Sequence, residues 1–180
     1  IAYDKNGNIS SLQRNGIGNN VKAGALLPMD NLTYKYAETG VYGSVNSNKL
    51  MHVGDAATSS YADDIKTPAG SWAGTPVYDY DEIGNLKKDK NEYIDKIEWT
   101  VDRKVKKITR DATAMLAAGV TKADIEYEYN SQRQRAVKIV KPRDPATKAI
   151  LPTKDWMYTY YVYDAGGNVA AVYERASSFY

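Results

Sequence analysis

Hydrophobic and polar residues alternate along several short stretches of the chain, and polar stretches that contain glycine separate them. In residues 169–174, for example, alternate side chains belong to opposite faces of a predicted strand. A second alternating stretch, residues 158–163, precedes it across a short glycine-rich connection. Two strands joined in this way form an antiparallel hairpin, so the pattern predicts an all-β chain built from hairpins.

The strand predicted at residues 158–163 has no clean apolar face. Tyr158, Tyr160 and Val162 fall on one face, and Tyr161 and Tyr163 fall on the other. A β-sandwich strand would normally have one apolar and one polar face. Tyrosine rings can cover neighbouring strands while their hydroxyls stay in water, so the pattern favours a single-layer sheet.

One spaced pattern recurs along the chain: Tyr-Asp, two residues, Gly-Asn and an apolar residue. The Asp suits the start of a turn, because its carboxylate accepts hydrogen bonds from amides two residues on, and the Gly tolerates a positive φ. Each copy predicts a hairpin loop of about three to five residues with a type I turn and a bulge. The complete copies are Tyr3, Asp4, Gly7, Asn8 and Ile9; Tyr80, Asp81, Gly84, Asn85 and Leu86; and Tyr163, Asp164, Gly167, Asn168 and Val169.

Degraded copies extend the series to six predicted units. The first two keep both tyrosines of the pattern and lose the Asp, and the third keeps one aromatic residue and has Val in place of the second Tyr. They are residues 32–40, with Tyr34 and Tyr36; residues 125–140, with Tyr127 and Tyr129 and with Asn130 replacing the Asp; and residues 94–109, with Trp99 assigned to the first Tyr and Val101-Asp102 assigned to Tyr-Asp.

Three segments interrupt this series. Residues 55–76 are rich in Gly, Ser, Asp and Pro and predict a long irregular connection. Residues 111–118 start with a capping Asp, continue with alanines and precede a Gly, which predicts a short helix. Three prolines in residues 141–155 predict a second irregular connection. We therefore expect a single repeat region over residues 1–180.

The composition favours an ordered chain whose packing relies on tyrosine, with 16 Tyr and 3 Trp against 1 Phe. The formal net charge is +2, from 24 basic and 22 acidic residues, which gives no bulk field to attract nucleic acid or an anionic membrane. The sequence contains no stretch of about 18 apolar residues, so no transmembrane segment is predicted. The absence of cysteine excludes disulfides, Cys-based zinc sites and a Cys nucleophile.

Candidate metal sites are weak. The single histidine, His52, would need carboxylates for all other zinc ligands, so we interpret it as a strand residue that faces the surface or a lumen. Residues 79–84 resemble the start of a calcium loop, but Ile83 and Lys90 stand where the loop needs ligands. We therefore expect no metal and no cofactor.

Candidate catalytic and nucleic-acid sites are no stronger. The adjacent acids Asp63 and Asp64 are interpreted as solvated loop residues, because nothing places them across a cleft. Residues 101–110 form the most basic run, but on a strand its charges would divide between two faces. Nucleic-acid recognition needs a concentrated stripe or interleaved aromatic rings. We expect no catalytic residue, and we give an enzyme hidden in the irregular segments the lowest weight.

The three complete units, with the stretches "NLTYKY" and "YYVYDAGGNVAAVYE", resemble the RHS or YD-repeat family of large secreted and cell-surface bacterial proteins. The resemblance covers most of the chain and is weakest at residues 53–76 and 141–155. It implies a ribbon of hairpins that curls into part of a hollow shell, often around a C-terminal toxin. Ala146-Thr147 follow Asp144-Pro145 where the family has an Asp-Pro-x-Gly signature, so self-cleavage is not carried over.

On this resemblance we expect a non-catalytic structural segment of a secreted or cell-surface shell that encloses or carries a toxin or effector. Its expected partners are the rest of the same polypeptide or neighbouring repeats, an enclosed toxin domain, and a surface glycan or the secretion machinery. The alternative is an adhesin or carbohydrate-binding module that uses exposed Trp72, Trp99 and Trp156 together with tyrosines. Either way, the open edges of a ribbon favour pairing with another strand.

Overall fold

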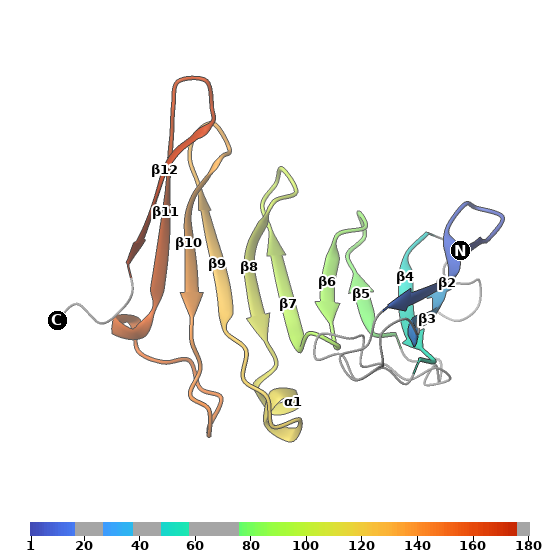
Figure 1. Ribbon diagram of the computed structural model, residues 1–180. Coiled ribbons are helices and arrows are strands. Elements are labelled where there is room, and N and C mark those ends of the chain that lie inside the picture. The colour runs from blue at the N-terminus through green and yellow to red at the C-terminus, as the bar shows by residue number, and fades with distance from the viewer. Residues whose placement is uncertain (17–26, 38–47, 58–75, 176–180) are drawn as a thin grey trace. The chain divides into compact units, whose positions relative to one another are not determined.

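The computed structural model describes residues 1–16, 27–37, 48–57 and 76–175 (Figure 1). Antiparallel β-structure dominates these residues, as the alternating pattern predicted, so the fold class is all-β. The strands are β1 (Ala2–Tyr3), β2 (Ile9–Gly16), β3 (Leu27–Tyr36), β4 (Leu50–Asp55), β5 (Tyr78–Tyr80), β6 (Leu86–Asp89), β7 (Ile94–Trp99), β8 (Val105–Arg110), β9 (Asp124–Tyr129), β10 (Arg135–Lys141), β11 (Met157–Tyr163) and β12 (Val169–Arg175); the helices are α1 (Ala112–Ala117) and the 3-10 helix η1 (Thr153–Asp155).

The chain divides into two compact units, Ile1–Tyr80 and Asp81–Tyr180. One sheet has the strand order β1-β2-β3-β4, and the other has the order β12-β11-β10-β9-β8-β7-β6-β5. Within each sheet the strands follow one another in sequence order. The described strands therefore form six successive hairpins, each built from an odd-numbered strand and the even-numbered strand after it, and these match the six predicted units.

The core of the first unit lies around β3 and β4. Leu32, Met51 and Val53 are buried, and every residue of β4 after Leu50 is buried. The registers place Leu32 of β3 opposite both Leu12 of β2 and Asp55 of β4, so β3 is paired along both of its edges.

In the second unit, α1 covers one end of the sheet and supplies the most buried side chain, Met115, which has no exposed surface. The side chain of Asp111 accepts a hydrogen bond from the backbone N of Ala114 at 2.9 Å and so caps the helix. Gly119, with φ of 67°, follows the helix end and supplies the left-handed residue of a helix stop. The short helix predicted near residues 111–118 is confirmed.

The hairpin of β11 and β12 exposes apolar groups on both of its faces. Tyr160 lies opposite Tyr173, and Tyr161 lies opposite Val172. Tyr160, Val172 and Tyr173 are all exposed, and the Tyr158 ring stacks on the Tyr160 ring at a centroid distance of 6.2 Å. These neighbours explain why the sequence shows no clean apolar face here, because in the described part of this unit no second sheet covers either face.

The connection at residues 141–155 contains no long regular element between β10 and β11, and hydrogen bonds from side chains organise it. The carboxylate of Asp144 accepts hydrogen bonds from the backbone N of Ala146 and of Thr147, at 2.9 and 2.7 Å, and an isolated bridge pairs Arg143 with Ile150. Prolines keep this segment out of long strands, but side-chain bonds organise it. In the other predicted connection, residues 58–75 lie outside the described part of the chain.

Candidate functional site

The turns of the three complete motifs share one hydrogen-bond pattern. In the first turn, the backbone N of Asp4 donates to the carbonyl of Asn8 at 2.8 Å, and the backbone N of Gly7 donates to the carbonyl of Asp4 at 3.1 Å. The Asp4 carboxylate accepts bonds from the backbone N of Asn6 and from both the backbone and the side chain of Asn8. The turns that begin at Asp81 and Asp164 repeat the two backbone bonds and the bonds from their Asn residues.

Each complete motif uses its glycine in the same way. Gly7, Gly84 and Gly167 have φ values of 82°, 89° and 84°, a region that side chains with a Cβ rarely adopt. A register shift follows between the end of β1 and the start of β2, and again between β11 and β12. In these two hairpins, the turn with a bulge that the motif predicted is thus confirmed.

These hydrogen bonds lower the pKa of the motif carboxyls. The side chain of Asn8 is the main cause at Asp4, and the backbone N of Asn168 is the main cause at Asp164. At Asp81, desolvation is the largest cause and raises the pKa, but the bonds from Asn85, Ile83 and Gly84 together outweigh it and the pKa is lowered there too. The carboxylate form is therefore the one that holds each turn together.

Two degraded motifs make the same turn with other side chains. Asn130 takes the place of the Asp, and its side-chain oxygen accepts a hydrogen bond from the backbone N of Gln134 at 2.8 Å. In the hairpin of β7 and β8, the Thr100 hydroxyl accepts the equivalent bond from the backbone N of Lys104 at 3.0 Å. The positive-φ positions hold arginine in place of glycine, with φ of 60° at Arg103 and 62° at Arg133.

The turn at Thr100 corrects the motif assignment in residues 94–109. Thr100 makes the bonds that the Asp makes in the complete motifs, and Trp99 therefore stands at the second aromatic position and not at the first. Val101 and Asp102, which the sequence pattern assigned to Tyr-Asp, lie inside the turn. Threonine can replace aspartate because its hydroxyl accepts the same backbone bond.

An aromatic side chain joins each hairpin to the one before it, and we call this bond the aromatic contact. The donor is the last residue of an odd-numbered strand, and the acceptor is the backbone carbonyl of the first residue of the preceding even-numbered strand. Where the two strands also pair within one sheet, such a bond fixes the register between hairpins in addition to the strand ladder. The contacts run from Tyr36 to Ile9 (3.0 Å), from Tyr80 to Leu50 (2.9 Å), from Trp99 to Leu86 (2.8 Å), from Tyr129 to Val105 (2.7 Å) and from Tyr163 to Arg135 (2.9 Å).

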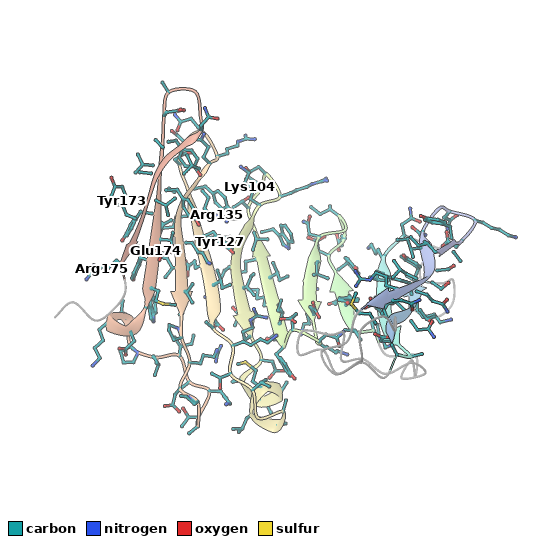
Figure 2. All side chains as sticks on the ribbon, viewed as in Figure 1. Lys104, Tyr127, Arg135, Tyr173, Glu174 and Arg175 are labelled. Atoms are coloured by element: carbon teal, nitrogen blue, oxygen red, sulfur yellow. The ribbon has the colours of Figure 1, made fainter. Side chains whose placement is uncertain are left out.

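The other motif tyrosines differ in environment. Tyr34 lies opposite Val53 in the β3–β4 pair. The guanidinium of Arg135 lies over the ring of Tyr127, 4.2 Å from the ring centre (Figure 2). Tyr3 ends the first described strand, is 61% exposed and makes no aromatic contact within the described residues.

A buried polar cluster between α1, β9 and the 142–150 connection has no counterpart in the sequence predictions. Asp124 is 1% exposed, and its carboxylate accepts two bonds from the Arg143 guanidinium at 2.9 Å each and one from the backbone N of Arg110 at 3.0 Å. Arg143 also donates to the carbonyls of Arg110 and Lys148. This bidentate, fully hydrogen-bonded geometry is the kind that a buried ion pair requires.

Lysines complete the cluster. Lys148 is 3% exposed, and its Nζ donates to the Thr121 hydroxyl at 2.7 Å. Lys141 pairs with Glu126 at 2.5 Å and places its Nζ 4.2 Å from the centre of the Trp156 ring. Because these partners lie far apart in sequence, the spacing of charged residues gave no signal for the cluster.

His52 lies in the buried part of β4, which corrects its interpretation as a surface or lumen-facing residue. It is 4% exposed, and burial lowers its pKa. Among the described residues, no group of three or more His, Cys, Asp or Glu side chains could hold a metal ion. No described helix is long and apolar enough to span a membrane.

Two of the tryptophans considered for glycan binding have partners inside the chain. The Trp99 indole makes an aromatic contact, and the Trp156 indole N–H donates to the carbonyl of Leu151 at 2.9 Å. Trp72, Asp63 and Asp64 lie outside the described residues. The basic run at residues 101–110 starts in a turn and becomes a strand only at Val105.

No protein-family model and no curated protein sequence matches this chain. Its distinguishing features are therefore those of its own geometry. Among the described residues, the same turn recurs in five hairpins and the aromatic contact in five bonds, and a buried ion pair lies at the opposite end of the second unit from the turns.

Proposed function

We propose that this chain is a non-catalytic structural segment of a secreted or cell-surface RHS/YD-repeat shell that encloses or carries a toxin or effector. The observation that supports the proposal is the recurrence of the aromatic contact. Five successive hairpins use the same donor and acceptor positions, so further hairpins can be added by the same rule. A sheet extended in this way is suited to making a wall.

The test is to isolate the native polypeptide that contains these residues, measure its intact mass and map its peptides outward. The proposal expects a mass far above 20.0 kDa, with more Tyr-Asp hairpins and an unrelated domain at the C-terminal side. A native mass near 20.0 kDa would contradict it.

Enclosure is tested on the same native protein by limited proteolysis. The C-terminal domain should resist protease within the native protein and should be cleaved when it is expressed on its own. Equal cleavage in both forms would reject enclosure, even if the mass and the repeats agree with the proposal.

A second candidate function, a carbohydrate-binding surface, is favoured by one observation. Tyr160 and Tyr173 lie opposite each other and are 39% and 62% exposed, which provides rings on which a sugar could stack. A glycan array probed with the whole chain tests it. Saturable binding that Tyr173→Ala removes and Tyr3→Ala retains would favour this function, because Tyr3 is similarly exposed in the other unit.

A further inference from the structure

β12 is the last strand of its sheet and pairs only with β11 in the described part of the chain (Figure 1). Natural edge strands are usually short or are protected by Lys, Pro or a bulge. β12 is seven residues long, and its first five residues carry neither charge nor proline. Its pairing with β11 contains a bulge, but β10 has a bulge in its pairing with β9 and still pairs with β11 on its other edge. Its side chains are also open to solvent, since Val169, Val172 and Tyr173 are 52%, 51% and 62% exposed. Within the part of the chain that the structure describes, this edge is therefore an unpaired template for another strand.

The aromatic contacts identify a backbone carbonyl at this edge as a further hydrogen-bond acceptor. The first residues of β2, β4, β6, β8 and β10 each accept an aromatic donor at their backbone carbonyl. Val169 is the first residue of β12 and holds the equivalent position. Within the described residues, its carbonyl is the one in this series that receives no aromatic donor.

We propose that β12 binds an antiparallel strand that ends in tyrosine, with the tyrosine hydroxyl donating to the Val169 carbonyl. The partner has the chemistry of β9 and β11, which are extended, rich in tyrosine, and followed by Asn or Asp. Main-chain pairing supplies most of the affinity in this mode of recognition, and the tyrosine sets the register. Binding requires only the edge and one carbonyl, so the inference goes beyond the proposed shell and does not depend on an enclosed effector.

The existing pairs give the register of the bound strand. Lys107 lies opposite Glu126, and continuing this register places Val105 opposite Glu128, one residue before the donor Tyr129. In the same way, the partner residue before the terminal tyrosine should lie opposite Val169. The rest of the partner strand should then extend along β12 toward Arg175, which marks the far end of the strand (Figure 2).

The experiment uses the whole chain and a fluorescent peptide that copies residues 124–130, DIEYEYN, which is acidic and contains the terminal tyrosine. Fluorescence anisotropy should show saturable binding. A matched peptide that carries Tyr129→Phe lacks only the hydroxyl and should bind about three- to tenfold more weakly. Amide hydrogen exchange should slow within residues 169–175 when the tyrosine peptide binds.

Two chain variants locate the binding site. Val172→Lys puts a charge on the edge and should weaken binding of the tyrosine peptide strongly. Val101→Lys makes the same substitution at a fully exposed position in the β7–β8 turn and should leave binding unchanged. Circular dichroism of both variants shows whether each keeps its fold.

Several outcomes would overturn the inference. No saturable binding of the tyrosine peptide would reject strand capture, and equal affinity for the phenylalanine peptide would reject the tyrosine contact. If sedimentation shows a dimer that Val172→Lys dissociates and the peptide does not, the occupant is a second copy of this chain and the proposal is wrong. These results leave the shell proposal separately testable, because that test is made on the native polypeptide.

Discussion

The two ends of the hairpins in the second unit are built by different means. At one end lie the turns that begin at Asp81, Thr100, Asn130 and Asp164, and all of them use the same short-range hydrogen bonds. At the other end lie the links between hairpins, which differ in length and include α1 and the 142–150 segment. The buried charged side chains lie at this second end: Asp124, Arg143 and Lys148 are each at most 9% exposed.

The repeated feature, the turn, and the feature expected to contribute most to stability, the buried ion pair, therefore lie at different ends of the hairpins. A turn closes with bonds among five neighbouring residues, so it can be copied many times and can tolerate altered side chains. The linking end buries an ion pair whose partners are 19 residues apart, and the loss of either partner leaves a buried charge unpaired. We therefore expect the largest effects of substitution at the linking end.

The largest expected effect is that of Asp124→Ala. It leaves the Arg143 guanidinium buried without its carboxylate and should lower the free energy of unfolding by about 3–5 kcal/mol. Urea denaturation measures the change. The control is Asp95→Ala, because the exposed Lys88–Asp95 pair should contribute about 1 kcal/mol or less. Equal effects would remove the proposed contrast between the two ends.

A double variant sharpens the same point. Asp124→Leu combined with Arg143→Met removes both charges and should recover much of the stability lost in Asp124→Ala, because neither partner is left unpaired. Recovery would show that the cost comes from the unpaired charge. A double variant as unstable as the single one would instead assign the cost to lost packing.

At the turn end, Gly167→Val should destabilise the protein by about 1 kcal/mol or more. The position has φ of 84°, and a Cβ there would lie 3.0 Å from Nε2 of Gln134. Gly84→Val isolates the backbone effect, since a Cβ at Gly84 meets nothing within 4 Å. An unchanged melting temperature for Gly167→Val would argue against a required positive φ.

Removal of one aromatic contact should have an effect of about 1 kcal/mol, the typical contribution of a single hydrogen bond. Tyr129→Phe keeps the ring and removes the hydroxyl that donates to Val105. Tyr3→Phe is the matched control, because the Tyr3 hydroxyl makes no aromatic contact among the described residues. Equal melting temperatures for the two variants would show that the contact sets register without adding stability.

Arg103→Gly should act in the opposite direction to Gly167→Val. Arg103 holds a positive φ of 60°, so glycine relieves backbone strain of roughly 0.5–1 kcal/mol, partly offset by the freedom glycine gains when unfolded. Thermal unfolding should therefore show a small rise in melting temperature. A clear fall would mean that the Arg103 side chain supports the turn.

The smallest effect is expected on acidification. Because Asp164 has a lowered pKa in the folded protein, its contribution to stability is present above the unfolded value near 3.8. That contribution is lost as the pH falls through the folded pKa. Carbon NMR of the carboxyl should follow this loss, while the turn at Asn130 keeps its bonds because an amide does not titrate. Simultaneous loosening of both turns would indicate general unfolding.

The features that could be predicted from sequence are those whose causes are local. Alternation with a period of two located the strands, and the Asp and Gly of each motif located the complete turns, because a turn is decided within a few residues. The same local reasoning placed α1 between its Asp cap and Gly119. The pattern failed at Thr100, where a different side chain makes the same bond and shifts the apparent motif.

The features that could not be predicted depend on contacts between distant residues. The aromatic contact joins Tyr163 to Arg135 and requires the register between two hairpins, which the sequence pattern does not contain. The pairing of Asp124 with Arg143 depends in addition on how two links fold back toward each other. The strand burial of His52 likewise depends on neighbours of β4 and not on the residues beside it in sequence.

The succession of hairpins in sequence order has a mechanical consequence for the second unit. Described strands in its interior are paired with their neighbours in sequence, so tension on the chain ends would load the ladder bonds one after another. Detaching a hairpin from the one before it would also require its aromatic contact to break. Passage through a narrow pore would therefore unravel the unit one hairpin at a time. Because nearly all the strand contacts join nearby segments, refolding on the far side should be rapid and could proceed in the same stepwise manner.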